Sequence, residues 1–105
     1  MPEIALGEIA HARSGDKGNH ANIGVVANEP SGYLHLERVL TAERVHAYFA
    51  SLGVTRVERF ELPRLGALNF LLYNALGGGA SQSLRIDTQG KLLGTAILDM
   101  KVEGA

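Results

Sequence analysis

Hydrophobic and polar residues alternate over residues 4–13, and this period of two predicts a first strand. The alternation changes phase near Gly7, which predicts a bulge or bend within that strand. The polar segment SGDKGNH then separates the strand from the apolar run 23–27, so we expect a long hairpin or two adjacent strands. Residues 28–32 contain Pro and Gly, and they are predicted to form a turn.

The clearest helix signal begins at Thr41, whose hydroxyl is predicted to accept a backbone N–H of the first helical turn. Apolar residues recur at helical spacing over residues 45–52. Gly53 suits the left-handed position that follows a helix. Residues 36–40 indicate an earlier helical turn, with a short strand as the alternative.

The middle of the chain holds a predicted strand and a long apolar run. Residues 54–62 are predicted to form a strand that stops at Pro63. The leucine spacing and the length of residues 65–76 favour a buried helix, which the three glycines 77–79 would end.

The C-terminal part is predicted to be a hairpin. Leu84 and Ile86 alternate, and residues 87–91 have the composition of a hairpin loop. The apolar residues at even positions over 92–102 alternate with Thr95, Asp99 and Lys101. The last segment is therefore expected to be a strand with one buried face. The sum is about five strands and two or three helices, an α+β sandwich with its helices packed on one face of a mostly antiparallel sheet.

Composition limits the class of protein. The chain has 105 residues, the size of a single domain, so residues 1–105 are predicted to form one domain. A net charge of −1 argues against nonspecific binding of nucleic acid or acidic membranes. The start of the chain lacks the pattern of a signal peptide, and no apolar run reaches the ~20 residues of a membrane span. The absence of cysteine fits a reducing compartment, so we expect a soluble cytoplasmic protein with neither nucleic-acid nor membrane partners.

The most distinctive segment is the predicted polar loop of residues 11–20, which places seven hydrogen-bonding side chains and two glycines at the end of a strand. Glycines let successive backbone N–H groups converge on an anion, and Arg13 and Lys17 would add positive charge. This pattern indicates a site for an anion or carboxylate. The alternative is an ordinary hairpin turn in which Asp16 caps its own backbone.

The same loop holds the candidates for acid–base chemistry, which are Asp16, Lys17 and His20, with His11 as a further choice. Such a role needs burial or a charged neighbour to bring a pKa near working pH, and spacing alone shows neither. Ser14 is a weaker candidate for a nucleophile because the GxSxG elbow is missing.

The four histidines lack the spacings of metal sites, so they are better explained as structural or surface residues, and no metal or cofactor is predicted.

Two features of the apolar segment add to the candidates. Asn69 and Asn74 interrupt it, which requires partners for both amides, either within the protein or on a ligand. The glycines 77–79 favour a turn after a helix, with close approach to a ligand as the alternative. The complete set of ligand-binding candidates is Arg13, Ser14, Gly15, Asp16, Lys17, Gly18, Asn19, Asn69, Gly77, Gly78 and Gly79.

Three strings make the chain similar to a known family: LGEIAHARSGDKGNHANIGVVA, LTAERVHAYF and ELPRLGALNFLLYNALGGGASQSLRIDTQGKLLGTAIL. They resemble the C-terminal domain of acyclic terpene utilisation proteins of the AtuA type, over about residues 5–100. The resemblance implies a ferredoxin-like α+β fold. It also implies a link to acyclic terpene breakdown through acyl-CoA intermediates. In that family the domain usually follows a much larger N-terminal domain and also occurs as a separate short chain.

The resemblance leaves two main interpretations of function. The first is a non-catalytic small subunit or accessory domain that pairs with a larger AtuA-type protein. The second is an enzyme or enzyme half, a hydratase-like lyase acting on an isoprenoid acyl-CoA through the loop from Arg13 to His20. A weaker alternative is a self-associating ligand-binding module. The first is favoured because no motif contains a complete catalytic set and a small domain does not enclose a long acyl-CoA.

Overall fold

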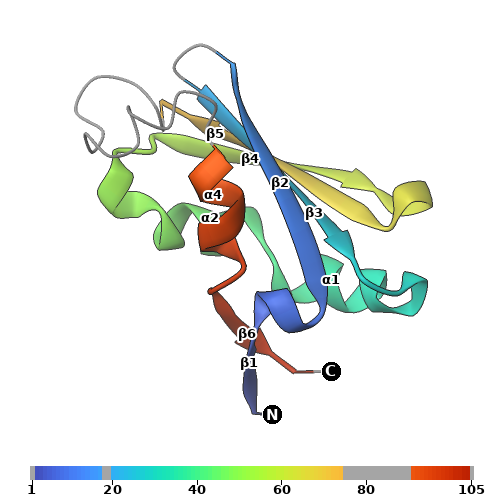
Figure 1. Ribbon diagram of the computed structural model, residues 1–105. Coiled ribbons are helices and arrows are strands. Elements are labelled where there is room, and N and C mark those ends of the chain that lie inside the picture. The colour runs from blue at the N-terminus through green and yellow to red at the C-terminus, as the bar shows by residue number, and fades with distance from the viewer. Residues whose placement is uncertain (1, 18–19, 75–90, 105) are drawn as a thin grey trace.

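The computed structural model describes residues 2–17, 20–74 and 91–104. Its centre is an antiparallel sheet of four strands in the order β2 (Ala10–Lys17), β3 (His20–Ala27), β5 (Ala67–Tyr73) and β4 (Arg56–Leu62), shown in Figure 1. Two short strands, β1 (Glu3–Ala5) and β6 (Lys101–Glu103), pair with each other at the two ends of the chain. This is the α+β, mostly antiparallel fold that the sequence predicts.

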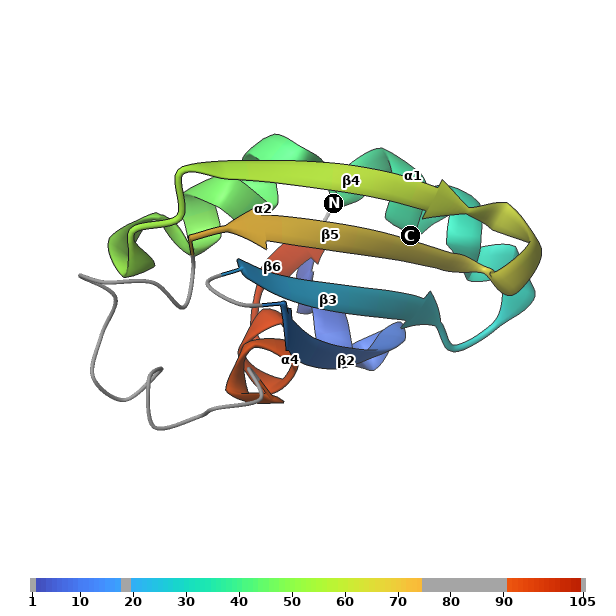
Figure 2. The same cartoon turned by 90° about the horizontal axis from the view of Figure 1, so that it is seen from above.

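The helices are α1 (Tyr33–Val39), α2 (Ala42–Tyr48) and α4 (Lys91–Ile97), and they cover the same face of the sheet (Figure 2). Every second residue of β3 and β5 points to them and is buried. The core includes Ala21, Ile23, Val25, Leu68, Phe70 and Leu72 from these two strands, packed against helix residues such as Leu36, Val45, Leu93 and Ile97. The opposite side of the four-stranded sheet, called the open face below, carries no helix among the described residues.

The order of the strands explains why the chain begins and ends with a pair of short ones. β3 and β4 are both antiparallel to β5, which lies between them, so β3, α1, α2 and β4 form a split βαβ unit. β5, α4 and β2 have the arrangement of a second such unit, except that β2 comes before β3 in the chain. The fold is therefore a circularly permuted βαββαβ, and the pairing of β1 with β6 takes the place of a covalent link between α4 and β2.

Several local predictions are confirmed. The Oγ1 atom of Thr41 accepts a hydrogen bond from the Arg44 backbone N–H at 3.1 Å, as an N-cap should. Gly53 is left-handed, with φ of 83°, after the short turn η3 (Ala50–Leu52). The earlier helical turn is α1, the predicted strand over residues 54–62 is β4, and the turn over residues 28–32 contains the 3-10 helix η2 (Pro30–Gly32).

The helix predicted over residues 65–76 is wrong, because this segment holds β5 at the centre of the sheet. The leucines that repeat at helical spacing also fit a period of two, in which Leu68, Phe70 and Leu72 are buried. The left-handed Gly66 comes directly before the strand, and the left-handed Asn74 comes directly after it. Residues 77–79 lie outside the described residues.

The final strand predicted over residues 92–102 is also wrong over most of its length, because residues 91–97 form α4 and only β6 is a strand. Leu93 and Ile97 are buried four residues apart, as on one face of a helix. Gly94 lets the helix approach β2, since a Cβ atom there would lie 3.0 Å from Ser14 Oγ. The apparent alternation fails at Leu93 and Ile97, which are apolar and buried although they lie at odd positions. The hairpin predicted from residue 84 to residue 91 falls mainly outside the described residues.

The bend predicted near Gly7 is a complete break between two strands. The 3-10 turn η1 (Leu6–Glu8) separates β1 from β2, and the two strands belong to different sheets. The backbone N–H groups of Leu6 and Gly7 donate to the carbonyls of Met100 and Leu98, so the turn is fixed to the end of the chain.

Candidate functional site

The segment predicted to be a polar loop is mostly strand. Residues 13–17 belong to β2 and His20 begins β3, with Lys17 paired to His20 across the hairpin. Gly18 and Asn19 lie outside the described residues. Of the two glycines expected in the cradle, Gly15 lies in a regular antiparallel ladder, where it pairs with Asn22.

The alternation of β2 sends neighbouring candidates to opposite faces of the sheet. Ser14 lies on the helix side, where its Oγ accepts the Gly94 backbone N–H at 2.8 Å and joins β2 to α4. Arg13 and Gly15 belong to the open face, and Arg13 is exposed. The backbones of Asp16 and Lys17 pair with those of Ala21 and His20.

The structure brings Arg13 and Asn69 into one row although they are far apart in the sequence. Arg13 pairs with Gly24, Gly24 pairs with Asn69, and Asn69 pairs with Phe60, so the row crosses all four strands. A Cβ atom on Gly24 would lie 3.8 Å from Asn69 Oδ1. The half-buried Asn22 lies two residues before Gly24 on the same face. Sequence reasoning missed Asn22, although its place between two buried strand residues is visible in the alternation of residues 20–27.

His20 belongs to a separate cluster at the hairpin end of the open face. Its Nδ1 accepts the Asn74 backbone N–H at 2.9 Å, which leaves the proton of the neutral ring on Nε2. Its ring lies 5.0 Å from that of Tyr73, over which the Arg56 guanidinium lies at 4.3 Å. The Tyr73 hydroxyl donates to Glu58, and this hydrogen bond lowers the pKa of the Glu58 carboxyl. These contacts fix the His20 ring in the cluster.

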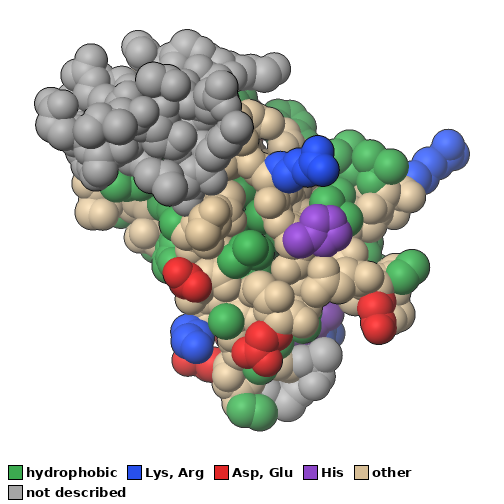
Figure 3. All heavy atoms as spheres, in the orientation of Figure 1, with side chains coloured by type: hydrophobic (Ala, Val, Ile, Leu, Met, Phe, Trp, Pro, Cys, Tyr) green, Lys and Arg blue, Asp and Glu red, His purple; other side chains and the backbone are tan. Residues whose placement is uncertain are grey.

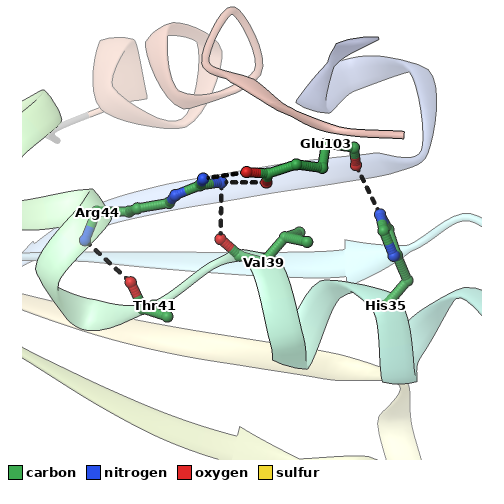
Figure 4. A network of polar contacts seen from close by, with 5 residues as sticks. All are labelled: His35, Val39, Thr41, Arg44 and Glu103. Atoms are coloured by element: carbon green, nitrogen blue, oxygen red, sulfur yellow. Dashed lines mark hydrogen bonds and ion pairs between the residues drawn. The ribbon is translucent and has the colours of Figure 1, made fainter. Parts of the chain in front are cut away.

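A second polar network lies at the end of the molecule where β6 meets the helices (Figure 4). Arg44 donates to both carboxylate oxygens of Glu103, at 2.7 and 2.5 Å, and to the Val39 carbonyl at 3.1 Å. The His35 Nε2 lies 2.7 Å from the Glu103 carbonyl oxygen. The hydrogen bonds from Arg44 lower the pKa of Glu103 to about 2. Sequence reasoning missed this pair because nothing local marks it.

The network borders a pocket of about 370 Å³ that contains none of the ligand-binding residues expected from the sequence. Its lining residues are His35, Arg38, Val39, Thr41, Arg44, Glu103 and Gly104. With the Glu103 carboxylate held by Arg44, we interpret the network as a clasp that holds the C-terminal strand against α1 and α2.

The four histidines lie apart, each with a hydrogen-bonding partner of its own. In residues 2–17, 20–74 and 91–104, no three His, Asp or Glu side chains gather in a way that could hold a metal ion. No helix in these same ranges is long and apolar enough to cross a membrane.

The comparison with protein families identifies the chain. The family model described as the AtuA ferredoxin-like domain matches residues 4–103, which is nearly the whole sequence. Searches of curated proteins and of solved structures found no match. The matched range includes the open face, the His20 cluster and the Arg44–Glu103 clasp. By this match and by its α+β fold, the chain belongs to the family of AtuA ferredoxin-like domains.

Proposed function

We propose that this chain is a small, non-catalytic subunit or accessory domain that pairs with a larger AtuA-type protein in the catabolism of acyclic terpenes and their isoprenoid acyl-CoA intermediates. The family match over residues 4–103 supports the link to AtuA-type proteins. The observation that carries the proposal is the open face, which has exposed apolar side chains and no covering helix among the described residues.

The apolar part of the open face lies on β4 and its neighbours. Phe60 and Leu62 are 45% and 40% exposed, and Leu65, just beyond the strand, is 70% exposed. Val26 and Leu71 also belong to this face, and both are half-buried. An exposed apolar patch with polar neighbours is typical of a protein interface. Figure 3 shows hydrophobic side chains beside a basic side chain and a histidine on the side of the molecule where β2 lies in Figure 1.

Two of the residues considered for chemistry have structural contacts, which supports a non-catalytic role. Ser14 is committed to α4, and His20 is held by Tyr73 and Asn74. Pockets of about 230 to 490 Å³ formed by the described residues lie elsewhere on the surface, and the lining of these pockets does not include Arg13, His20 or Asn69. An acyl-CoA is usually enclosed by the walls of a cleft, which the partner would supply under this proposal.

The test is affinity co-purification of the tagged chain from its native host, followed by native mass spectrometry. We expect a stoichiometric complex with a chain of several hundred residues, as a much larger partner requires. Phe60→Ser together with Leu62→Ser should reduce recovery of that partner by at least about tenfold, because the apolar contact is lost. The control is Leu34→Ser on α1, which removes a leucine that is 72% exposed on the helical side.

Two results would contradict the proposal. Recovery of the chain as a homo-oligomer alone would favour self-association, for which β2 and β4, the edge strands of the sheet among the described residues, provide a route. Turnover of an isoprenoid acyl-CoA by the isolated chain would favour the enzymatic alternative.

A further inference from the structure

Three polar side chains gather around a glycine at the centre of the open face. Gly24 lies in β3 between Arg13 on β2 and Asn69 on β5, and Asn22 precedes it by two residues on the same face. Gly15 pairs with Asn22, so two glycines alternate with the three polar residues in neighbouring rows. The result is an area in which two glycines leave the backbone uncovered by their own side chains, with polar side chains at its border.

These three side chains have no hydrogen bond or ion pair within residues 2–17, 20–74 and 91–104, whereas other arginines of the chain do. Arg44 and Arg59 both bind glutamates at 2.8 Å or less. Asn22 and Asn69 are half-buried residues, and within the part of the chain that the structure describes their side-chain amides form no hydrogen bond. A ligand with hydrogen-bonding groups would satisfy them.

The glycine has a cost that packing does not explain. A glycine within a strand is less stable than alanine by roughly 0.5–1 kcal/mol, and it often marks a place where a ligand approaches the backbone. A Cβ atom at Gly24 would meet its nearest neighbours only at 3.8 and 4.0 Å, which is ordinary contact distance. The protein itself therefore does not require glycine there, but a ligand lying on the strand would.

The chemistry of the site favours oxygen anions. A guanidinium presents parallel N–H donors that match a carboxylate or phosphate, and asparagine amides add further donors. The nearest described acidic side chain on this face, Glu58, already accepts from Tyr73 and pairs with Arg56. The apolar Phe60 and Leu71 lie beside the polar group in the register and would contact an apolar part of the ligand.

We propose that Arg13, Asn22 and Asn69, arranged around Gly24, form a binding site for the carboxylate or phosphate group of a small molecule. The site does not depend on the proposed partner, because all its parts belong to this chain.

The test is a titration of the isotope-labelled isolated chain, followed by NMR, with inorganic phosphate in one arm and octanoate in the other. We expect saturable shifts of the Asn22 and Asn69 side-chain amides in at least one arm, and the responding arm identifies the anion. Arg13→Gln should weaken binding by at least about tenfold. Gly24→Val should also weaken binding, because its side chain would cover the backbone of the site. If the valine variant does not fold, Asn69→Leu replaces it as a test, because it removes an amide of the site.

Arg64→Gln is the matched control, since Arg64 is exposed on the turn η4 (Pro63–Leu65) outside the site and its loss changes the net charge equally. It should leave binding unchanged. The proposal is overturned if neither anion gives saturable shifts, or if Arg64→Gln weakens binding as much as Arg13→Gln does.

Discussion

At the scale of single residues, the Arg44–Glu103 pair shows how one long-range contact holds the end of the chain. Both side chains are partly exposed, and their two charge-assisted hydrogen bonds join β6 to α2. The bond between His35 and the Glu103 carbonyl adds a second attachment, to α1. The end strand is therefore held by side chains as well as by its pairing with β1.

The first prediction concerns the pH dependence of this clasp. The pKa of Glu103 is about 2 in the folded chain, compared with an ordinary 4.5, so its stabilisation is complete above pH 4.5 and is lost as the pH falls toward 2. Glu103→Gln should lower the thermal midpoint at pH 7 and flatten its decline between these pH values. Melting curves of both proteins across this range measure the effect. Glu43→Gln on the exposed first turn of α2 is the control, and equal flattening in the control would contradict the assignment.

At the scale of elements, the contact between α4 and β2 explains why a segment with a strand-like pattern is helical. The helix lies directly on the strand at Gly94, whose backbone N–H donates to Ser14 Oγ. A β-carbon at this position would lie 3.1 Å from the Ser14 backbone nitrogen, which has no freedom to move away. The absence of a side chain is therefore a packing requirement of the helix.

The second prediction follows from this contact. Gly94→Val should destabilise the protein by about 2–3 kcal/mol, because the added side chain overpacks the interface between helix and strand. Urea unfolding at pH 7 gives the free energy of unfolding. Thr95→Val, next to it on the exposed side of α4, should change stability by no more than about 0.5 kcal/mol. Equal stability of the two variants would show that α4 does not press on β2.

At the scale of the whole molecule, the permuted order of strands brings the two ends together. The Gly104 backbone N–H donates to the Pro2 carbonyl at 2.9 Å, next to the ladder of β1 and β6. Circular permutation is well tolerated where the ends lie close and the new ends fall at the surface. The chain therefore has the geometry to be converted into an unpermuted βαββαβ.

The third prediction tests this description of the fold. A variant in which a short Gly/Ser linker joins residue 104 to residue 2, and which is opened between β2 and β3, should fold to the same sheet. Its amide NMR spectrum should match that of the original away from the new ends and the linker. A control opened within β5, the central strand, should fail to fold. A folded control together with an unfolded β2–β3 variant would contradict the assigned topology.

Features that depend on neighbouring residues could be predicted from the sequence. The cap at Thr41 and the left-handed Gly53 depend on contacts within a few residues of the chain. The resemblance to AtuA-type domains covers about residues 5–100, close to the range 4–103 that the family model matches. The sequence also selected Arg13 and Asn69 as distinctive, but it placed them in a loop and a helix, whereas they lie in the strands β2 and β5.

The tertiary structure decided what depends on distant partners. A run of leucines satisfies both a helical and a strand period, and β5 is a strand because β3 and β4 supply hydrogen bonds on both of its edges. The position of Arg13 and Asn69 in one row depends on the register of three strands, and the Arg44–Glu103 clasp depends on the pairing of β1 with β6. Local sequence sets the turns and caps because their hydrogen bonds close over a few residues, whereas these features require the packed sheet.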